Sequence, residues 1–176
     1  AAKGIELESF RRMSQVLSEE LPERFRKNIA VLSGPSHAEE VVKGLPTAVV
    51  VASAEREVAE KVGRILMNSF FRIYTNTDMI GVELGGALKN VIAICSGISD
   101  GLELGDNSRA ALMTRGIVEI ARLGVKLGAN PSTFFGLSGI GDLMVTCSSM
   151  HSRNRRAGME IGRGKTVKQV LEATNM

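Results

Sequence analysis

The spacing of apolar residues changes near residue 76, and this change limits the folds that the chain can adopt. Before it, apolar runs at residues 48–52 and 70–74 predict strands. Helical spacing between these runs predicts a helix with Ser53 as its N-cap. A strand, a helix and a strand in this order form a crossover and favour a parallel sheet. An earlier apolar run at residues 29–32 predicts a further strand.

After residue 76 the sequence shows only helical patterns. The longest predicted helix runs from Asp78 to about residue 98, and Asp106 with Asn107 caps a second one that ends before Pro131. The other predicted helices lie at residues 10–21, 138–147, 153–161 and 166–173. We therefore expect an α/β domain over residues 1–75 and an all-α domain over residues 76–176.

The composition excludes several classes of protein. With 176 residues, 44% of them hydrophobic and 23% charged, the chain is neither disordered nor a disulfide-stapled mini-protein. The formal net charge is only +3 and there is no tryptophan, so a nucleic-acid partner is not favoured. Cys95 and Cys147 lie in apolar stretches, which predicts reduced thiols and a cytoplasmic protein. The most apolar stretch, residues 79–98, contains Glu83 and Lys89, so we do not expect it to span a membrane.

The segment Ser33-Gly34-Pro35-Ser36-His37-Ala38-Glu39 follows a predicted strand and opens a predicted helix. Ser36 and Glu39 have the spacing of a capping box, which would make the segment purely structural. The same geometry also suits a ligand, because a glycine lets a ligand approach the backbone and a helix N-terminus offers N–H groups to an anion. The residues alone leave both interpretations open.

The run Gly81-Val82-Glu83-Leu84-Gly85-Gly86-Ala87-Leu88-Lys89-Asn90 lies inside the long predicted helix. A glycine inside a helix costs about 1 kcal/mol relative to alanine, so these glycines indicate a close approach of another backbone or a ligand. Helical spacing places Lys89 on one stripe with Gly86 and Ala93. Such a lysine either extends its charged end to the surface or is desolvated, with a pKa low enough for acid–base catalysis near neutral pH.

Two polar motifs follow in the last third of the chain. Asp142, after a Gly-Ile-Gly sequence, is a helix N-cap, a counter-ion for Lys89, or both. The cluster Ser152-Arg153-Asn154-Arg155-Arg156 is either a solvated basic face or a phosphate cradle, since arginine holds phosphate through two hydrogen bonds. His37 and His151 are too isolated for a metal site and the cysteines lack C-x-x-C spacing, so we expect no bound metal.

Together, six segments resemble the NAD(P)-dependent glycerol-3-phosphate dehydrogenase family of the bacterial type, in the family's order. They are Lys3-Gly4-Ile5-Glu6, Leu32-Ser33-Gly34-Pro35-Ser36, Gly44-Leu45-Pro46-Thr47-Ala48, the run from Gly81 to Asn90, Gly105-Asp106-Asn107 and Ser152-Arg153-Asn154-Arg155-Arg156. The resemblance implies the second half of a Rossmann-like domain, followed by a helical domain similar to the C-terminal domain of 6-phosphogluconate dehydrogenase. It also implies hydride transfer between NAD or NADP and the pair sn-glycerol 3-phosphate and dihydroxyacetone phosphate, which supplies glycerol 3-phosphate for phospholipid synthesis.

The resemblance also implies roles for individual residues. Lys89 would accept a proton when the C2 hydroxyl is oxidised and would donate it in the reverse direction. The implied substrate contacts are Lys3, Gly34, Ser36, Lys89, Asp142, Ser152, Arg153 and Asn154. The implied cofactor contacts are Lys3, Ala38 and Arg153. A nearby Lys3 would help to lower the pKa of Lys89.

The sequence departs from this family's pattern at both ends. No G-x-G-x-x-G follows a predicted strand, and Lys3-Gly4 resembles a point well inside the family's sequence. We therefore expect part of a longer enzyme, possessing little activity alone, with a homodimer as one hypothesis for its assembly. The alternative is a non-catalytic anion-binding or assembly domain that uses the Arg153–Arg156 cluster. A third hypothesis is a dehydrogenase for another hydroxy substrate, against which the phosphate-binding run argues.

Overall fold

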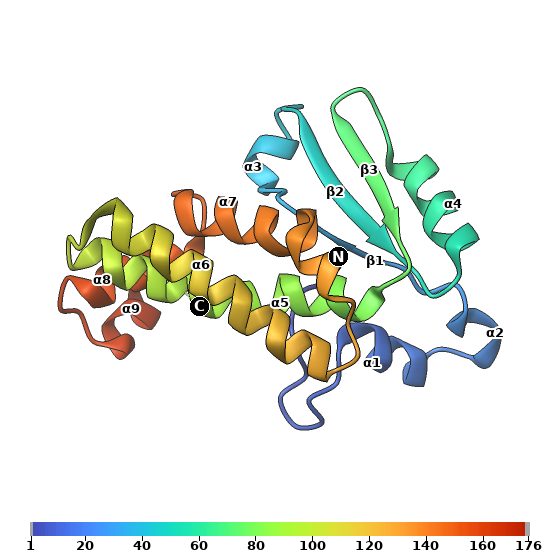
Figure 1. Cartoon of the computed structure of the whole chain (residues 1–176), viewed down its shortest axis with the longest axis horizontal. Coiled ribbons are helices and arrows are strands. Elements are labelled where there is room, and N and C mark those ends of the chain that lie inside the picture. Colours follow the sequence, from blue (N-terminus) through green and yellow to red (C-terminus); the bar gives the residue numbers. More distant parts are fainter. Residues whose placement is uncertain (1, 175–176) are drawn as a thin grey trace.

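The strands of the computed structural model, which describes residues 2–174, form one small mixed sheet (Figure 1). The sheet contains β1 (Val31–Ser33), β2 (Thr47–Ala52) and β3 (Phe71–Asn76) in that order. Strands β2 and β3 are parallel and are joined by α4 (Arg56–Leu66), which confirms the predicted crossover. Strand β1 pairs with β2 in the antiparallel direction, so the expectation of a parallel sheet holds for β2 and β3 alone.

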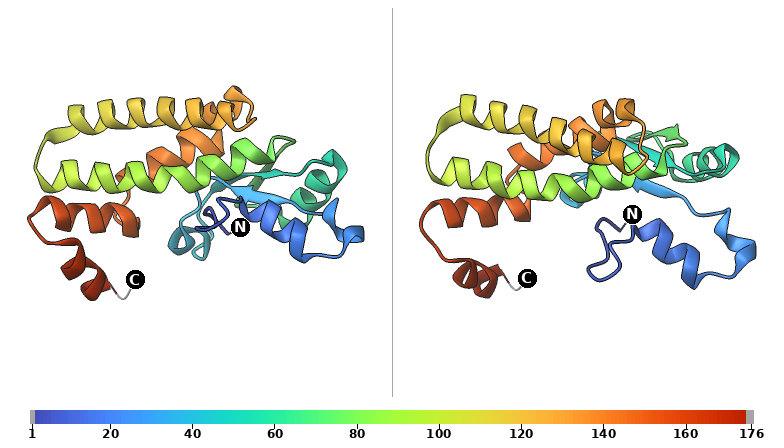
Figure 2. Two further views of the ribbon diagram at one scale, coloured as in Figure 1. Left: turned by 90° about the horizontal axis from the view of Figure 1, so that it is seen from below. Right: turned by 60° about the horizontal axis from the view of Figure 1, so that its bottom comes forward.

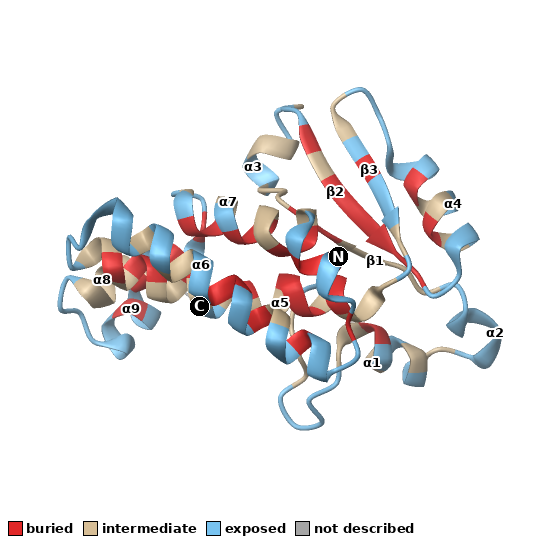
Figure 3. Cartoon of the chain, viewed as in Figure 1, coloured by how far each residue is buried: buried red, intermediate tan, exposed pale blue. Residues whose placement is uncertain are grey.

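Strand β2 forms the centre of the sheet, and buried residues run along it (Figure 3). Val49 and Val51 pack into a cluster with Ala59 of α4 on one face. Val50 packs with Val82 of the helix that follows β3, on the other face. Because both faces are covered, the strand is a continuous apolar run rather than an alternation of apolar and polar residues.

The second part of the chain is helical and is built around one long central helix, α5 (Met79–Gly101). In both views of Figure 2, α5 lies between α6 (Gly105–Lys126) and α8 (Arg153–Gly162). The other helical elements are η1 (Pro131–Phe135), the π-helical turn η2 (Leu137–Gly141), α7 (Asp142–Ser148) and α9 (Val167–Thr174). The order of sheet first and helices second confirms the predicted fold class.

Helix α5 is long and apolar enough to cross a membrane by length and composition, and it is the one such helix among residues 2–174. Its apolar residues have partners inside the protein. Leu84 and Ala93 pack with Ile117 of α6 and Leu143 of α7. The packing on several sides accounts for the apolar composition of α5, as expected for the core helix of a folded domain.

Two predicted caps in the first part are wrong, because the serine hydroxyls bind carbonyl groups instead. Ser36 donates to the carbonyl of Gly34 at 3.1 Å, and His37 precedes the short helix α3 (Ala38–Val41). Ser53 donates to the carbonyl of Ile29 at 2.8 Å, and Glu55 precedes α4. The capping-box interpretation of Ser36 and Glu39 is therefore excluded.

Two predicted helix boundaries also differ from the structure, and one short helix was not predicted. The first helix, α1, covers Met13–Glu20, and Phe10 lies outside it with a positive φ of 56°. A short helix, α2 (Glu23–Arg26), follows where no helix was predicted. Helix α6 begins at Gly105, so Asp106 and Asn107 lie in its first turn and do not cap it. The predicted domain limits at residues 1 and 176 lie outside the described residues.

Candidate active site

Helices α5 and α7 bring Lys89 and Asp142 together in the interior. Lys89 Nζ donates a hydrogen bond to Asp142 Oδ1 and a second one, 2.7 Å long, to Thr146 Oγ1. Lys3 Nζ donates to the other carboxylate oxygen, Asp142 Oδ2, at 2.7 Å. Lys89 is 6% exposed and Asp142 is 1% exposed. The lysine is therefore desolvated rather than extended to the surface, and Asp142 is its counter-ion. We call these four residues the lysine cluster.

Burial, together with the charges of the lysine cluster, explains how Lys89 can exchange a proton near neutral pH. Burial lowers the pKa of Lys89 from 10.5 to about 8, Asp142 opposes this shift, and the charge of Lys3 adds to it. Two ammonium groups share one carboxylate, so the cluster carries one net positive charge when both lysines are protonated. Such a cluster favours an anionic ligand or a negative charge that develops on an oxygen atom.

The paired glycines of α5 allow the lysine cluster to assemble. A Cβ atom on Gly85 would lie 2.4 Å from the carbonyl oxygen of Ser138, in the turn that leads into α7. A Cβ atom on Gly86 would lie 2.7 Å from Ser33 Oγ at the end of β1. These contacts confirm that the glycines mark a close approach, and the approaching groups are other parts of the chain.

The segment from Gly34 to Ala38 connects β1 to α3 and lies beside the start of α7. Gly34 has a φ of 142°, which favours glycine. Pro35 packs next to Gly141, which directly precedes Asp142. The rings of His37 and His151 lie 5.8 Å apart, and His151 directly precedes the N-cap of α8. The segment predicted to bind substrate and cofactor thus faces the predicted phosphate-binding motif.

The basic motif at the start of α8 divides into an inner and an outer side. Ser152 is buried, and its hydroxyl accepts a hydrogen bond from the backbone N–H of Arg155 as the N-cap of the helix. Arg153 is exposed and Asn154 is partly buried, so both can contact a ligand. Arg155 is buried and forms an ion pair with Asp100 of α5. The solvated-face interpretation is therefore wrong for Arg155.

Thr146, whose hydroxyl lies between Lys89 and the backbone of α7, was not among the residues predicted from the sequence. Thr146 Oγ1 accepts from Lys89 and donates to the carbonyl of Asp142 at 2.6 Å. Residues four apart share a helix face, so the spacing of Asp142 and Thr146 is the signal that could have revealed it. Arg155 carried no comparable signal, because its partner Asp100 is 55 residues away in the sequence.

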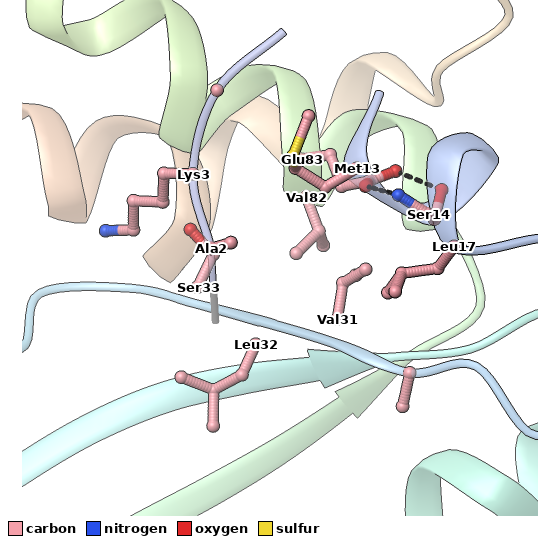
Figure 4. A pocket seen from close by; sticks show the side chains of 12 residues that line it. Ala2, Lys3, Met13, Ser14, Leu17, Val31, Leu32, Ser33, Val82 and Glu83 are labelled. Carbon is pink, nitrogen blue, oxygen red and sulfur yellow. Dashed lines mark hydrogen bonds between the residues drawn. The ribbon is translucent and has the colours of Figure 1, made fainter. Parts of the chain in front are cut away.

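A cavity of about 80 Å³ lies between the N-terminal segment, α1, β1 and α5, and its lining is mostly apolar (Figure 4). Glu83 lies at its edge and accepts two hydrogen bonds from Ser14, each 2.7 Å long. Val31 and Leu17 lie on one side of this cavity and Lys3 lies on the opposite side, with its side chain directed away from them (Figure 4). Within residues 2–174, no group of three or more His, Cys, Asp and Glu side chains could hold a metal ion.

Comparisons with known proteins agree with this geometry. A sequence profile for the C-terminus of NAD-dependent glycerol-3-phosphate dehydrogenase matches residues 78–176, and one for its N-terminus matches residues 1–59. A relative from Moorella thermoacetica, named glycerol-3-phosphate dehydrogenase (NAD(P)+), is 64% identical over 175 residues, which are 99% of this chain and 51% of the relative. A relative of the same name from Bacillus cereus is 58% identical over 176 residues, which are 100% of this chain and 52% of the relative.

The chain thus spans about half the length of the curated relatives it matches. A crystal structure of glycerol-3-phosphate dehydrogenase from Coxiella burnetii has a TM-score of 0.90 and 44% identity, and the match covers 99% of this chain and 52% of that one. The Rossmann-like first part and the helical second part have the same arrangement in that structure. The chain therefore belongs to the NAD-dependent glycerol-3-phosphate dehydrogenase family.

Proposed function

We propose that this chain forms the catalytic centre of an oxidoreductase that interconverts sn-glycerol 3-phosphate and dihydroxyacetone phosphate with NAD or NADP. The observation that carries the proposal is the lysine cluster, in which a buried amine with a lowered pKa is held by Asp142 and Thr146. Reduction of a ketone needs one proton at the carbonyl oxygen, and a buried lysine that titrates near neutral pH can supply it.

Two polar atoms support a cofactor and substrate site at the segment from Gly34 to Ala38. Ser33 Oγ and His37 Nε2 are buried and have no hydrogen-bond partner among the described residues, as expected where a polar ligand provides the partner. Ala38 begins α3 and is exposed, so we assign Ala38, Lys3 and Arg153 to the cofactor. When bound, NADH or NADPH supplies a hydride to C2 of dihydroxyacetone phosphate.

Lys89 performs the proton transfer in this proposal. Its ammonium group donates a proton to the C2 oxygen of the ketone, and the resulting neutral amine recovers a proton from solvent. In the oxidation direction, the neutral amine accepts the proton of the C2 hydroxyl. Asp142 orients the amine, and Lys3 keeps the site positive, which stabilises negative charge on the C2 oxygen.

The phosphate end of the substrate lies at the start of α8 in this proposal. Ser152, Arg153 and Asn154 offer a helix N-terminus, a guanidinium group and an amide, which are suitable donors for phosphate. Gly34 and Ser36 contact the substrate from the facing segment. The contact between the rings of His37 and His151, which join these two segments, supports this placement.

The organisation of the longer protein is part of the same proposal. Residues 1–75 belong to the cofactor domain and residues 76–176 to the substrate domain. Free Cys95 and Cys147 support a cytoplasmic enzyme, which would supply glycerol 3-phosphate for phospholipid synthesis. A homodimer is proposed as its assembly. Because the chain spans half the length of its relatives, we expect it to have little activity alone.

A hybrid enzyme tests the proposal. In this hybrid enzyme, the chain replaces the matching segment of the Moorella thermoacetica relative, and NADH oxidation with dihydroxyacetone phosphate is measured. We expect activity in the hybrid enzyme, and Lys89→Ala should lower kcat by about 100- to 10,000-fold with the fold retained. Lys126→Ala, which removes a lysine from the exposed side of α6, is the control and should keep full activity. Near-normal turnover after Lys89→Ala would contradict the assignment.

Calorimetry separates this proposal from the non-catalytic alternative. An inactive hybrid enzyme that still binds glycerol 3-phosphate, and loses that binding after Arg153→Ala, would favour an anion-binding domain. An active hybrid enzyme in which the same substitution weakens substrate binding supports the dehydrogenase.

A further inference from the structure

Asp100 connects three helices through a partly buried ion network that the proposed proton transfer does not use. The Asp100 carboxylate accepts from Arg155 of α8 through Nε at 2.9 Å and pairs with Nη2 at 2.7 Å. Its other oxygen accepts from Nη1 of Arg109 of α6 at 3.0 Å. The side chains of Asp100 and Arg155 are 11% and 9% exposed. An ion pair this far from water holds a fixed geometry, because its partners have few alternative hydrogen bonds.

Asp100 and Lys89 lie on the same face of α5, three helical turns and about 16 Å apart. Between them, Ser96 donates to the carbonyl of Cys147 at the end of α7. A Cβ atom on Gly97 would lie 2.0 Å from the carbonyl oxygen of Arg155. Helix α7 and the start of α8 are therefore held along this one face of α5. This face of α5 therefore fixes the distance between Lys89, where the proton is transferred, and the start of α8.

Arg155 also fixes the orientation of the first turn of α8. With the Arg155 side chain directed to Asp100, Arg153 lies about 200° around the helix and is exposed. The backbone N–H of Arg155 donates to the hydroxyl of Ser152, so the same residue fixes the first turn. Loss of the ion pair would loosen this first turn and would move Arg153 and Asn154 together, while Gly158 and Gly162 keep the rest of α8 packed on α5.

We propose that Asp100, acting through Arg155, is a positioning residue that sets the affinity of the site for the phosphate group of its substrate. This inference rests on the proposed function. Asp100 touches neither the substrate nor the reacting atoms. It holds the first turn of α8 so that Ser152, Arg153 and Asn154 present their donors to one phosphate group.

The test uses Asp100→Asn in the hybrid enzyme and two substrates, dihydroxyacetone phosphate and dihydroxyacetone, which lacks the phosphate. We expect KM for dihydroxyacetone phosphate to rise about tenfold or more, with kcat changed by less than about threefold. Competitive inhibition by inorganic phosphate should weaken by a similar factor. The value of kcat/KM for dihydroxyacetone should stay within about twofold, because only the phosphate end is disturbed.

The matched control is Asp78→Asn, the same substitution at the other end of α5. Asp78 also holds two contacts with a distant segment, Thr133 Oγ1 at 2.7 Å and the N–H of Asn130 at 2.9 Å, but no hydrogen bond or ion pair joins it to α8 among the described residues. The thermal stability of the Asp78→Asn variant should fall, while its KM for both substrates should be unchanged. Equal losses for both substrates after Asp100→Asn, or an unchanged KM, would overturn the inference.

Arg155→Lys is a second variant that tests the same inference if Asp100→Asn does not fold. The lysine keeps the buried positive charge but cannot make both hydrogen bonds, so it should show the same selective rise in KM to a smaller extent. If neither variant folds, the pair is required for folding and the positioning role is rejected. An inactive unsubstituted hybrid enzyme would instead refute the proposed function, and this inference with it.

Discussion

Asp142→Asn should move the pH at which the hybrid enzyme loses its reductive activity. Burial already lowers the pKa of Lys89 to about 8, and Asp142 is the main group that opposes this shift. An opposite charge at hydrogen-bond distance shifts a pKa by roughly two units, so its removal should lower the pKa of Lys89 to about 6. The protonated fraction of Lys89 at pH 7 then falls from about nine tenths to about one tenth. Dihydroxyacetone phosphate reduction at pH 7 should therefore slow by about tenfold through this effect alone.

The assay is the pH dependence of kcat/KM for reduction, which reports the ionisation of the free enzyme. The unsubstituted hybrid enzyme should lose activity as the pH rises through about 8, and the Asp142→Asn variant about two pH units lower. Asp106→Asn, at an exposed carboxylate in the first turn of α6, is the control and should leave the midpoint unchanged. A variant that is slower at every pH but keeps the original midpoint would refute the reasoning, because Asp142 would then not set the pKa of Lys89.

Two further predictions concern the chain itself. Gly97→Ala should lower the free energy of unfolding by about 1–3 kcal/mol or more, because the new Cβ atom would lie 2.0 Å from the carbonyl oxygen of Arg155. The control is Val91→Ala, on an exposed side of α5, which should lower the free energy of unfolding by less in the same denaturation experiment. Burial raises the pKa of the Cys147 thiol to about 11, so iodoacetamide at pH 8 should leave Cys147 unmodified in the native chain. Unfolding in guanidinium should expose Cys147 and Cys95 to the reagent. Rapid labelling of Cys147 in the native state, detected by mass spectrometry, would contradict its buried placement.

The parts of the fold that the sequence predicts best depend on local patterns. Residues 47–52 are a valine-rich run between turn signals, and the helix after them has apolar residues at helical spacing, so the β2–α4–β3 crossover was predicted with small errors at its ends. The prediction of an N-cap was wrong where a distant carbonyl group accepts the hydrogen bond of the serine hydroxyl. Ser53 binds the carbonyl of Ile29, which the fold brings close and which no local pattern indicates.

In the candidate site, too, residues marked by a local sequence pattern were predicted, and roles that depend on a distant partner were not. Lys89 stood out because a charged residue interrupts an apolar helix, and the structure explains its place by the contact with Asp142, 53 residues later. Arg155 was grouped with its basic neighbours, since a run of arginines gives no sign of which side chain faces the interior. Asp100 determines this in the folded chain, and it is 55 residues away.

The glycines of α5 show why a helix of low intrinsic stability is suited to this position. Each glycine costs about 1 kcal/mol relative to alanine in a helix. In return, Gly85 leaves space for the turn that precedes α7, and Gly86 leaves space for Ser33 and the side chain of Lys3. Gly97 leaves space for the backbone of α8 at Arg155. Larger residues would move the neighbouring elements away from α5, and with them the partners of Lys89 and Asp100. The same glycines that suggested a nearby ligand in the sequence therefore act one step earlier, by fixing the distances between the groups that would bind it.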